Sequence, residues 1–159
     1  MIDIRQARPD DFESIARLII SDEELFLVYP SGKFPFDALQ VKELYEARKD
    51  FSVVTYHDSI IGFANLYDFL AGKYVFIGNV LISSTYRGKG YGKKLLQYMI
   101  NLAHGYDLEE VRLSVFADNA PALVLYTVFG FELYDIREQK NHLGEAVTLL
   151  HMRKILSSR

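Results

Sequence analysis

A glycine-rich segment near the middle of the chain separates an apolar run from an apolar-periodic stretch. Residues 86–94 read YRGKGYGKK, and the nearly continuous apolar run at 74–82 is typical of a strand buried on both faces. After the glycines, apolar residues recur at helical spacing: Tyr91, Leu95, Tyr98, Met99 and Leu102. Glycine lets a backbone approach a ligand closely, and the first N–H groups of a helix have no internal partners. Strand, turn and helix together therefore predict an anion site for a phosphate or pyrophosphate.

The spacing of the glycines excludes two common phosphate-binding loops. A dinucleotide fold requires G-x-G-x-x-G near the start of a βαβ unit, whereas this segment reads G-x-G-x-G and follows an expected hairpin. A P-loop requires a hydroxyl residue after its G-K pair, but Lys94 follows Gly92 and Lys93. The pattern that remains is [RQ]-x-x-G-x-[GA], filled by Arg87, Gly90 and Gly92.

The rest of the chain alternates strand and helix patterns. Apolar alternation predicts further strands at 2–7, 51–57, 60–68, 111–116, 131–137 and 146–152. Helical spacing predicts helices at 9–19, 36–48, 91–102 and 119–130, with 21–35 irregular. The expected order is β-α-α-β-β-β-α-β-α-β-β. We predict one domain over residues 1–159, of mixed α/β (α+β) class, with helices on both faces of a central sheet.

Composition excludes several classes of function. The net charge of −3 argues against a nucleic-acid partner, because phosphate binding needs clustered Lys and Arg. Without cysteine there is no disulfide, thiolate metal site or cysteine nucleophile, and the four histidines show no metal-ligand spacing, so we expect no metal. The N-terminus lacks a signal-peptide pattern and no apolar run reaches membrane length, which predicts a cytoplasmic protein with no membrane partner.

Two segments carry a family resemblance. Residues 79–92 resemble the acyl-CoA signature of the GNAT superfamily of N-acetyltransferases, with Ser84 in place of the usual proline. Residues 119–131, NAPALVLYTVFGF, are similar to the second motif of that family, N-x-x-A-x-x-L-Y-x-x-x-G-F. The two segments stand in the order and separation that the family has. The resemblance implies a GNAT-like, mostly antiparallel mixed sheet and acetyl-CoA as the acyl donor.

The resemblance also implies where acetyl-CoA binds. In the family, the strand before the glycine-rich loop splays from its neighbour and binds pantetheine through backbone groups, as one peptide strand binds another. The pyrophosphate lies on the amides of the loop. Carried over to this sequence, the donor-binding residues are Val80, Leu81, Ile82, Arg87, Gly88, Lys89, Gly90, Tyr91, Gly92, Lys93 and Asn119. Asn119 is also expected to N-cap the helix that follows it.

The resemblance assigns one catalytic residue. Tyr126 matches the tyrosine that family members use as the general acid for the departing CoA thiolate. Many relatives also place a glutamate base on the central strand or the strand after it. Here those regions offer Asn79 and Ser114 but no carboxylate. A water relayed by Ser114, Asn79 or backbone carbonyls, or an amine that arrives neutral, are the remaining routes.

The acceptor side is expected in the segment after the first helix. Glu23, Glu24, Phe26 and Tyr29 would suit a cationic amine through charge pairing and cation–π contact. His142, in a late segment expected to form the other wall, has the chemistry of a base.

The resulting hypothesis is acetyl transfer from acetyl-CoA to a primary amine of a small molecule, by direct attack in a ternary complex. A protein N-terminal acetyltransferase of the ribosomal-protein type and a non-catalytic CoA-sensing module are the alternatives. Since dimers are common among family members, a homodimer is one assembly that the resemblance implies.

Overall fold

The structure, a computed structural model, describes residues 1–156 and contains in that range a seven-stranded sheet of order β1-β2-β3-β4-β5-β7-β6. The strands are β1 (Ile2–Gln6), β2 (Lys49–Tyr56), β3 (Ser59–Leu70), β4 (Tyr74–Ile82), β5 (Glu110–Phe116), β6 (Glu132–Lys140) and β7 (Ala146–Ile155). Only β4 and β5 pair in parallel, and the other neighbours are antiparallel. The sheet is therefore mixed and mostly antiparallel, which confirms the predicted fold class.

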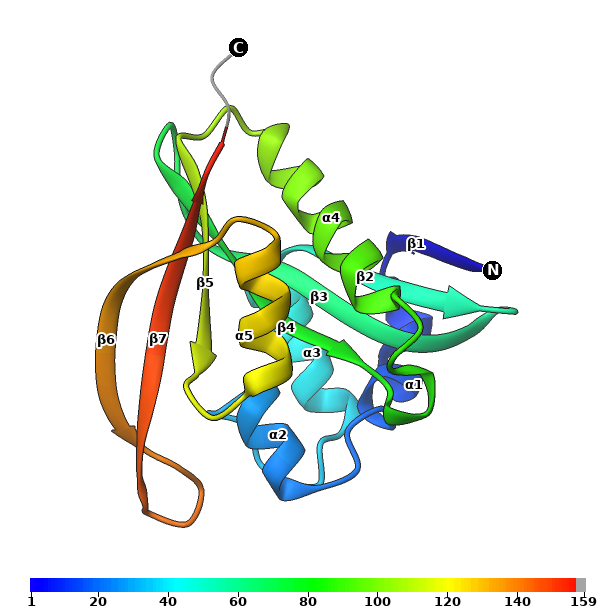
Figure 1. Cartoon of the computed structure of the whole chain (residues 1–159). Helices are drawn as coiled ribbons and strands as arrows, with labels where there is room; N and C mark the ends of the chain where they lie inside the picture. Colours follow the sequence, from blue (N-terminus) through cyan, green and yellow to red (C-terminus); the bar gives the residue numbers. More distant parts are fainter. Residues whose placement is uncertain (157–159) are drawn as a thin grey trace.

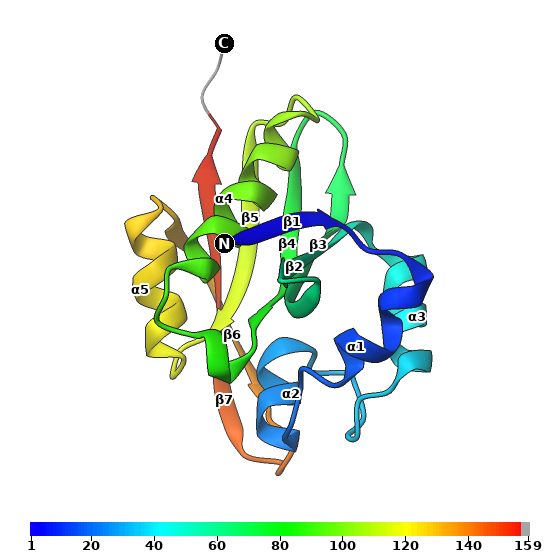
Figure 2. The same cartoon turned by 90° about the vertical axis from the view of Figure 1, so that its right-hand side faces the viewer.

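Helices cover both faces of this sheet, as predicted. The helical elements are η1 (Pro9–Asp11), α1 (Phe12–Ala16), α2 (Asp22–Val28), α3 (Ala38–Ala47), η2 (Ser84–Tyr86), α4 (Tyr91–His104) and α5 (Ala120–Val128). Helices α4 and α5 lie on one face, and α1, α2 and α3 lie on the other (Figure 1, Figure 2). Within residues 1–156, no helix has the length and apolar composition that crossing a bilayer requires.

Each face has its own hydrophobic core. Leu95 and Met99 of α4 pack fully buried against Val75 of β4. On the other face, Ile15 of α1 and Val41 of α3 pack against the equally buried Phe63 of β3. Burial of this kind contributes about 1.5 to 3 kcal/mol per large apolar side chain. The two cores hold the sheet rigid while its central strands carry the site described below.

Helix α2 forms where the sequence predicted an irregular segment. Ser21 caps it by accepting a hydrogen bond from the Glu24 N–H at 3.0 Å, and acids occupy its first turn, where the helix dipole favours them. Leu25 and Phe26 bury its inner face. This helix is too short for its apolar period to be read from sequence. The first predicted helix is also shorter than expected, because it divides into η1 and α1 and ends at Ala16.

Strands β4 and β5 diverge toward their C-terminal ends (Figure 1). They pair only from Tyr74 with Glu110 to Ile77 with Leu113, although both strands continue beyond those residues. At the divergence β4 carries one extra residue relative to β3, and Asn79 there has a φ of 54°. A bulge of this type bends the strand that contains it and strengthens its twist. The result is an opening in the middle of the sheet.

Candidate active site

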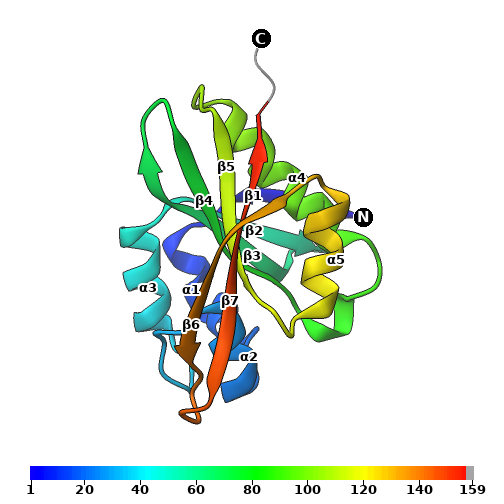
Figure 3. The ribbon, with the colours of Figure 1, turned by 60° about the vertical axis from the view of Figure 1, so that its left-hand side comes forward.

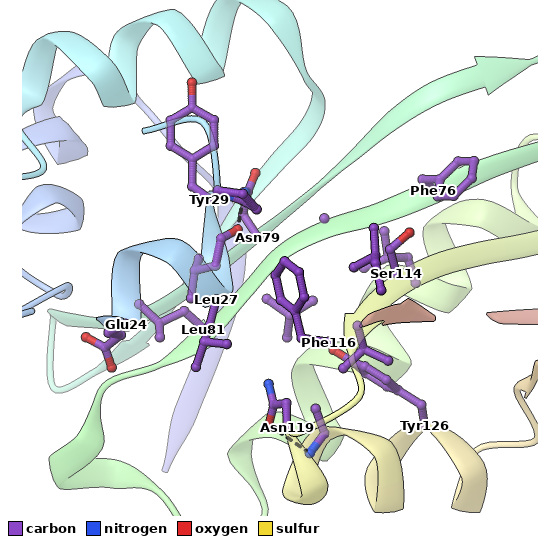
Figure 4. A pocket seen from close by; sticks show the side chains of 18 of the residues that line it. Glu24, Leu27, Tyr29, Phe76, Asn79, Leu81, Ser114, Phe116, Asn119 and Tyr126 are labelled. Carbon is purple, nitrogen blue, oxygen red and sulfur yellow. Dashed lines mark hydrogen bonds between the residues drawn. The ribbon is translucent and has the colours of Figure 1, made fainter. Parts of the chain in front are cut away.

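A cavity of about 930 Å³ opens where β4 and β5 diverge, and side chains from both faces of the sheet line it. From the face covered by α5 come Ala122 and Tyr126. From the face covered by α2 and α3 come Arg48, Tyr67 and Ser114. Figure 4 shows Ser114 and Tyr126 among the side chains that line it. Two reactants entering from opposite faces can therefore meet in the gap between the strands.

The glycine-rich segment lies at the edge of this cavity and has the geometry of an anion site. Gly88 and Gly90 have φ values of 78° and 85°, a region that disfavours other residues, and Gly90 is the N-cap of α4. Within residues 1–156, the backbone N–H groups of residues 88–93 have no hydrogen-bond acceptor. This range holds the predicted pyrophosphate ligands: Gly88, Lys89, Gly90, Tyr91, Gly92 and Lys93. None of these six residues lines the cavity, and the last residue before them that does is Arg87.

The end of β4 supplies a free backbone edge beside the cavity. Val80, Leu81 and Ile82 line the cavity, and this part of β4 makes no ladder with β5. Apart from the Ile82 carbonyl, which accepts from Arg87, its outward peptide groups are available to a ligand that carries amides of its own, in the manner of an added strand.

Arg87 and Asn119, both predicted to contact CoA, line the cavity and also have structural roles. Arg87 donates from Nε to the Ile82 carbonyl at 2.7 Å and from Nη2 to the Glu24 carboxylate at 2.6 Å. This ion pair ties α2 to the start of the glycine-rich segment. Asn119 caps α5, as predicted, by accepting from the Ala122 N–H at 3.4 Å.

Tyr126 faces the cavity from α5 with an unpartnered hydroxyl. The residue is only 7% exposed, and within the described part of the chain its hydroxyl makes no hydrogen bond. Burial raises the pKa of Tyr126 to about 12, because the phenolate is poorly solvated there. The phenol therefore keeps its proton at neutral pH and can donate it to a group in the cavity.

A serine–histidine pair lines the cavity from the other face. Ser114 of β5 and His151 of β7 are register partners, and their Oγ and Nδ1 atoms lie 2.6 Å apart. Burial lowers the pKa of His151, with Asp135 opposing that shift, while Arg137 and Arg112 reinforce it. The imidazole is therefore neutral at pH 7 and can accept a proton.

Sequence reasoning missed His151 because its partner lies in a strand 37 residues earlier in the chain. The sequence shows a polar residue in each of these two apolar strands. It does not show which residues of the two strands face each other. His142, which the sequence did single out, lies in the turn between β6 and β7 and does not line the cavity. Asn79 is the other relay candidate. Its Oδ1 atom accepts from Asn65 Nδ2 at 2.7 Å, and its Nδ2 atom donates to the Val28 carbonyl at 2.7 Å, so both ends of the amide are engaged within the protein.

The four residues predicted to bind the acceptor separate into two groups. Glu24 and Tyr29 line the cavity, although Glu24 is already paired with Arg87. Glu23 is exposed on α2, and Phe26 is buried with its ring stacked 4.7 Å from that of Phe116. The structure does not bring these two to the cavity wall. Within residues 1–156 there is also no cluster of three or more His, Asp or Glu side chains that could hold a metal ion.

Comparison with known proteins agrees with this geometry. The chain is 41% identical over 59 residues to the spermine/spermidine N(1)-acetyltransferase of Bacillus subtilis (strain 168), covering 36% of this chain and 39% of that protein. It is 31% identical over 83 residues to the L-amino acid N-acetyltransferase AaaT of Escherichia coli (strain K12), covering 48% of each. The chain thus spans less than half the length of these curated relatives.

The fold has close solved counterparts. The structure of yncA from Salmonella typhimurium, with its cofactor acetyl-CoA, superposes with a TM-score of 0.82 at 21% identity, covering 99% of this chain and 95% of that one. The sequence model of the acetyltransferase (GNAT) family matches residues 13–131, well over half of the sequence. The chain therefore belongs to the GNAT family of acetyltransferases.

Proposed function

We propose that the protein transfers the acetyl group of acetyl-CoA to the primary amine of a small molecule. The observation that carries the proposal is the cavity between the diverging strands, with a protonated phenol on one side and a neutral serine–histidine pair on the other. Acetyl-CoA supplies the acetyl group as a reactive thioester.

The donor site has parts that suit the two ends of CoA. The unpartnered N–H groups of residues 88–93, with the dipole of α4, suit a pyrophosphate. The free edge of β4 at residues 80–82 suits the amides of pantetheine. Pantetheine bound along that edge would place the thioester near the opening in the sheet.

Ser114 and His151 activate the acceptor in this proposal. Ser114 Oγ and His151 Nδ1 lie 2.6 Å apart. In the tautomer whose Nδ1 carries no proton, the Ser114 hydroxyl donates to that nitrogen, and the Ser114 oxygen can accept a proton from the attacking amine. The amine nitrogen bonds to the acetyl carbon, and its proton passes through Ser114 to His151. This pair takes the place of the carboxylate base that the sequence lacks.

Tyr126 completes the transfer on the opposite face. As the carbon–sulfur bond breaks, the electron pair goes to sulfur and the Tyr126 hydroxyl gives it a proton. The proton held by His151 and the one lost by Tyr126 exchange with solvent, so the enzyme returns to its starting state.

A contact between α2 and the β6–β7 turn, beside the cavity, favours a small acceptor over a peptide. The rings of Phe26 on α2 and His142 in the β6–β7 turn lie 5.6 Å apart. Figure 3 shows this turn reaching alongside α2. A protein N-terminus needs an open groove beside the cavity, and in this proposal the contact between the two segments closes one approach to it. A homodimer and a cytoplasmic location remain predictions from the sequence.

A thiol-release assay with a panel of small amines and N-terminal peptides tests the proposal. We expect CoA release with at least one small amine and little with peptides, whereas the reverse preference would favour the protein-acetylating alternative. Stabilisation by CoA in thermal unfolding, without turnover of any acceptor, would indicate a sensing module instead.

A further inference from the structure

Arg48 places a cationic group in the acceptor end of the cavity. It follows α3 and lines the cavity together with Tyr67, Gly78 and Ser114. Its guanidinium stacks over the Tyr67 ring, 4.1 Å from the ring centroid, and Nη1 donates to the Asn65 Oδ1 atom at 3.2 Å. These contacts hold the guanidinium in one orientation at the wall.

Gly78 makes room for this group. A Cβ atom at position 78 would lie 2.7 Å from Arg48 Nη1 and 2.6 Å from Tyr67 Cε1, closer than such atoms pack. The guanidinium therefore lies directly against β4, where that strand leaves β5 and the cavity begins. The absence of a side chain at position 78 is thus part of what positions Arg48.

Within residues 1–156, Arg48 lacks the carboxylate partner that most of the arginines there have. Arg5 pairs with Asp11, and Arg87, also at the cavity, pairs with Glu24. Among residues 1–156 no acid pairs with Arg48, and its one hydrogen bond leaves the remaining N–H groups of the fork free. Asp68 is near enough to raise the pKa of Arg48, but burial outweighs it and lowers that pKa. A half-buried cation of this kind is costly unless an anion joins it.

We propose that Arg48 binds a carboxylate of the acceptor, so that the substrate is an amine that also carries a carboxylate. The inference rests on the proposed function, since it assigns the substrate class of the same site. The planar fork of arginine matches a carboxylate through two parallel hydrogen bonds. The cavity thus contains an arginine that can bind an anion, whereas the sequence predicted acidic residues that would bind a cationic amine.

The amine and carboxylate sites are neighbours. The ring of Tyr67 lies beneath the Arg48 guanidinium, and Ser114 is close enough to Tyr67 to oppose the rise in phenol pKa that burial causes. Ser114 in turn contacts His151. A compact molecule could therefore place its amine at Ser114, near the Tyr67 hydroxyl, and its carboxylate at Arg48, over the face of the same ring.

Matched acceptors test this assignment. Kinetics with alanine against alaninamide, and phenylalanine against phenylalaninamide, isolate the carboxylate while keeping the amine. Glycine, β-alanine and 4-aminobutyrate then vary the spacing between the two groups. We expect kcat/KM to favour the acids about tenfold to a hundredfold, the range of a charged hydrogen-bonded pair. Equal rates for acids and amides, in an enzyme that acetylates both, would overturn the inference and leave the proposed function intact.

Variants separate binding from folding. Arg48→Met should raise KM for the acids about tenfold or more while the amides change little, and Arg48→Lys should restore only part of the preference. Arg153→Met is the control, because Arg153 also lies near a tyrosine ring, 5.7 Å from that of Tyr134, but outside the cavity. Unchanged selectivity in folded Arg48→Met, verified by thermal unfolding, would contradict the inference.

A binding measurement covers the case in which no acceptor turns over. Calorimetry of N-acetylalanine and N-acetylalaninamide with the wild-type protein in the presence of CoA should show tighter binding of the acid, and Arg48→Met should remove that difference. If turnover is absent but this difference holds, the carboxylate site stands and the proposed function fails. If the acid and the amide bind equally, the carboxylate site is wrong.

Discussion

Ser114 and Tyr126 line one cavity from opposite faces of the sheet, Ser114 from β5 and Tyr126 from α5 (Figure 4). The gap between them exists because β4 and β5 stop pairing after Ile77 and Leu113. In the proposed reaction, Ser114 can thus serve the amine, which must lose a proton, and Tyr126 can serve the CoA sulfur, which must gain one.

Tyr126→Phe should lower kcat about a hundredfold or more, the range that a positioned general acid supplies. Affinity for CoA, measured by calorimetry, should change little because only the hydroxyl is lost. The folded state should be as stable as wild type, since that hydroxyl makes no hydrogen bond within the described residues. Tyr98→Phe on α4, outside the cavity, is the matched control. A kcat equal to that of wild type over a range of pH would remove Tyr126 from the mechanism.

The pH profile of kcat/KM, calculated on the concentration of neutral acceptor amine, should report His151. Its pKa is lowered by burial, so the rate should hold at neutral pH and fall only below its usual value of 6.5, as the imidazole takes up a proton. Tyr126, with a pKa of about 12, should cause no loss on the alkaline side below that pH. His151→Gln should abolish the acidic limb and lower kcat, and His142→Gln should leave both unchanged. An acidic limb that persists in His151→Gln would assign the base elsewhere.

Gly90→Asp should weaken CoA binding more than tenfold, because it sets a carboxylate against the pyrophosphate site. Gly72→Asp is an unusually close control. Both glycines have a positive φ, 85° and 75°, and a Cβ at either would meet nothing within 4 Å. Each variant should lose about 1 to 2 kcal/mol of stability from the strained backbone. Calorimetry should find normal CoA affinity only in Gly72→Asp, and equal losses in both variants would point to folding alone.

Asp11→Asn should cost about 1 to 3 kcal/mol of unfolding free energy. Its carboxylate accepts from Arg5 at 2.8 and 3.0 Å and from the Arg8 N–H at 2.8 Å, which fixes the turn from β1 into η1. Arg5 holds the pKa of Asp11 below its usual value. The contribution is therefore complete above about pH 4 and is lost as the pH falls through the lowered pKa. Urea unfolding at pH 7 and at lower pH should show the variant's deficit shrinking on acidification, and a constant deficit would contradict this.

Local patterns in the sequence predicted most of the fold. The β4 range matched at both ends, because a continuous apolar run bounded by a turn and a serine pair needs no tertiary information. Helix α2 was missed because its formation depends on one cap and two buried side chains rather than on a long period. The glycine-rich segment was readable because strand, turn and helix are consecutive there.

Contacts between residues far apart in the sequence could not be predicted from it. Glu24 was assigned to the acceptor, but it pairs with Arg87, 63 residues later. The Ser114–His151 pair depends on the register of β5 with β7, and the position of Arg48 depends on a glycine in β4. Sequence spacing carries no information about such contacts until the order of strands in the sheet is known.

The most direct test of acetyl transfer in this cavity is the stoichiometry of one reaction. Acetyl-CoA and a panel of amino acids and simple amines are incubated with wild type and with Tyr126→Phe, and CoA release and acetylated product are quantified by mass spectrometry. We predict one acetylated amine per CoA released by wild type, and product formation about a hundredfold slower in the variant at equal CoA affinity. CoA bound normally by wild type, with no acetylated amine from any acceptor, would contradict the account.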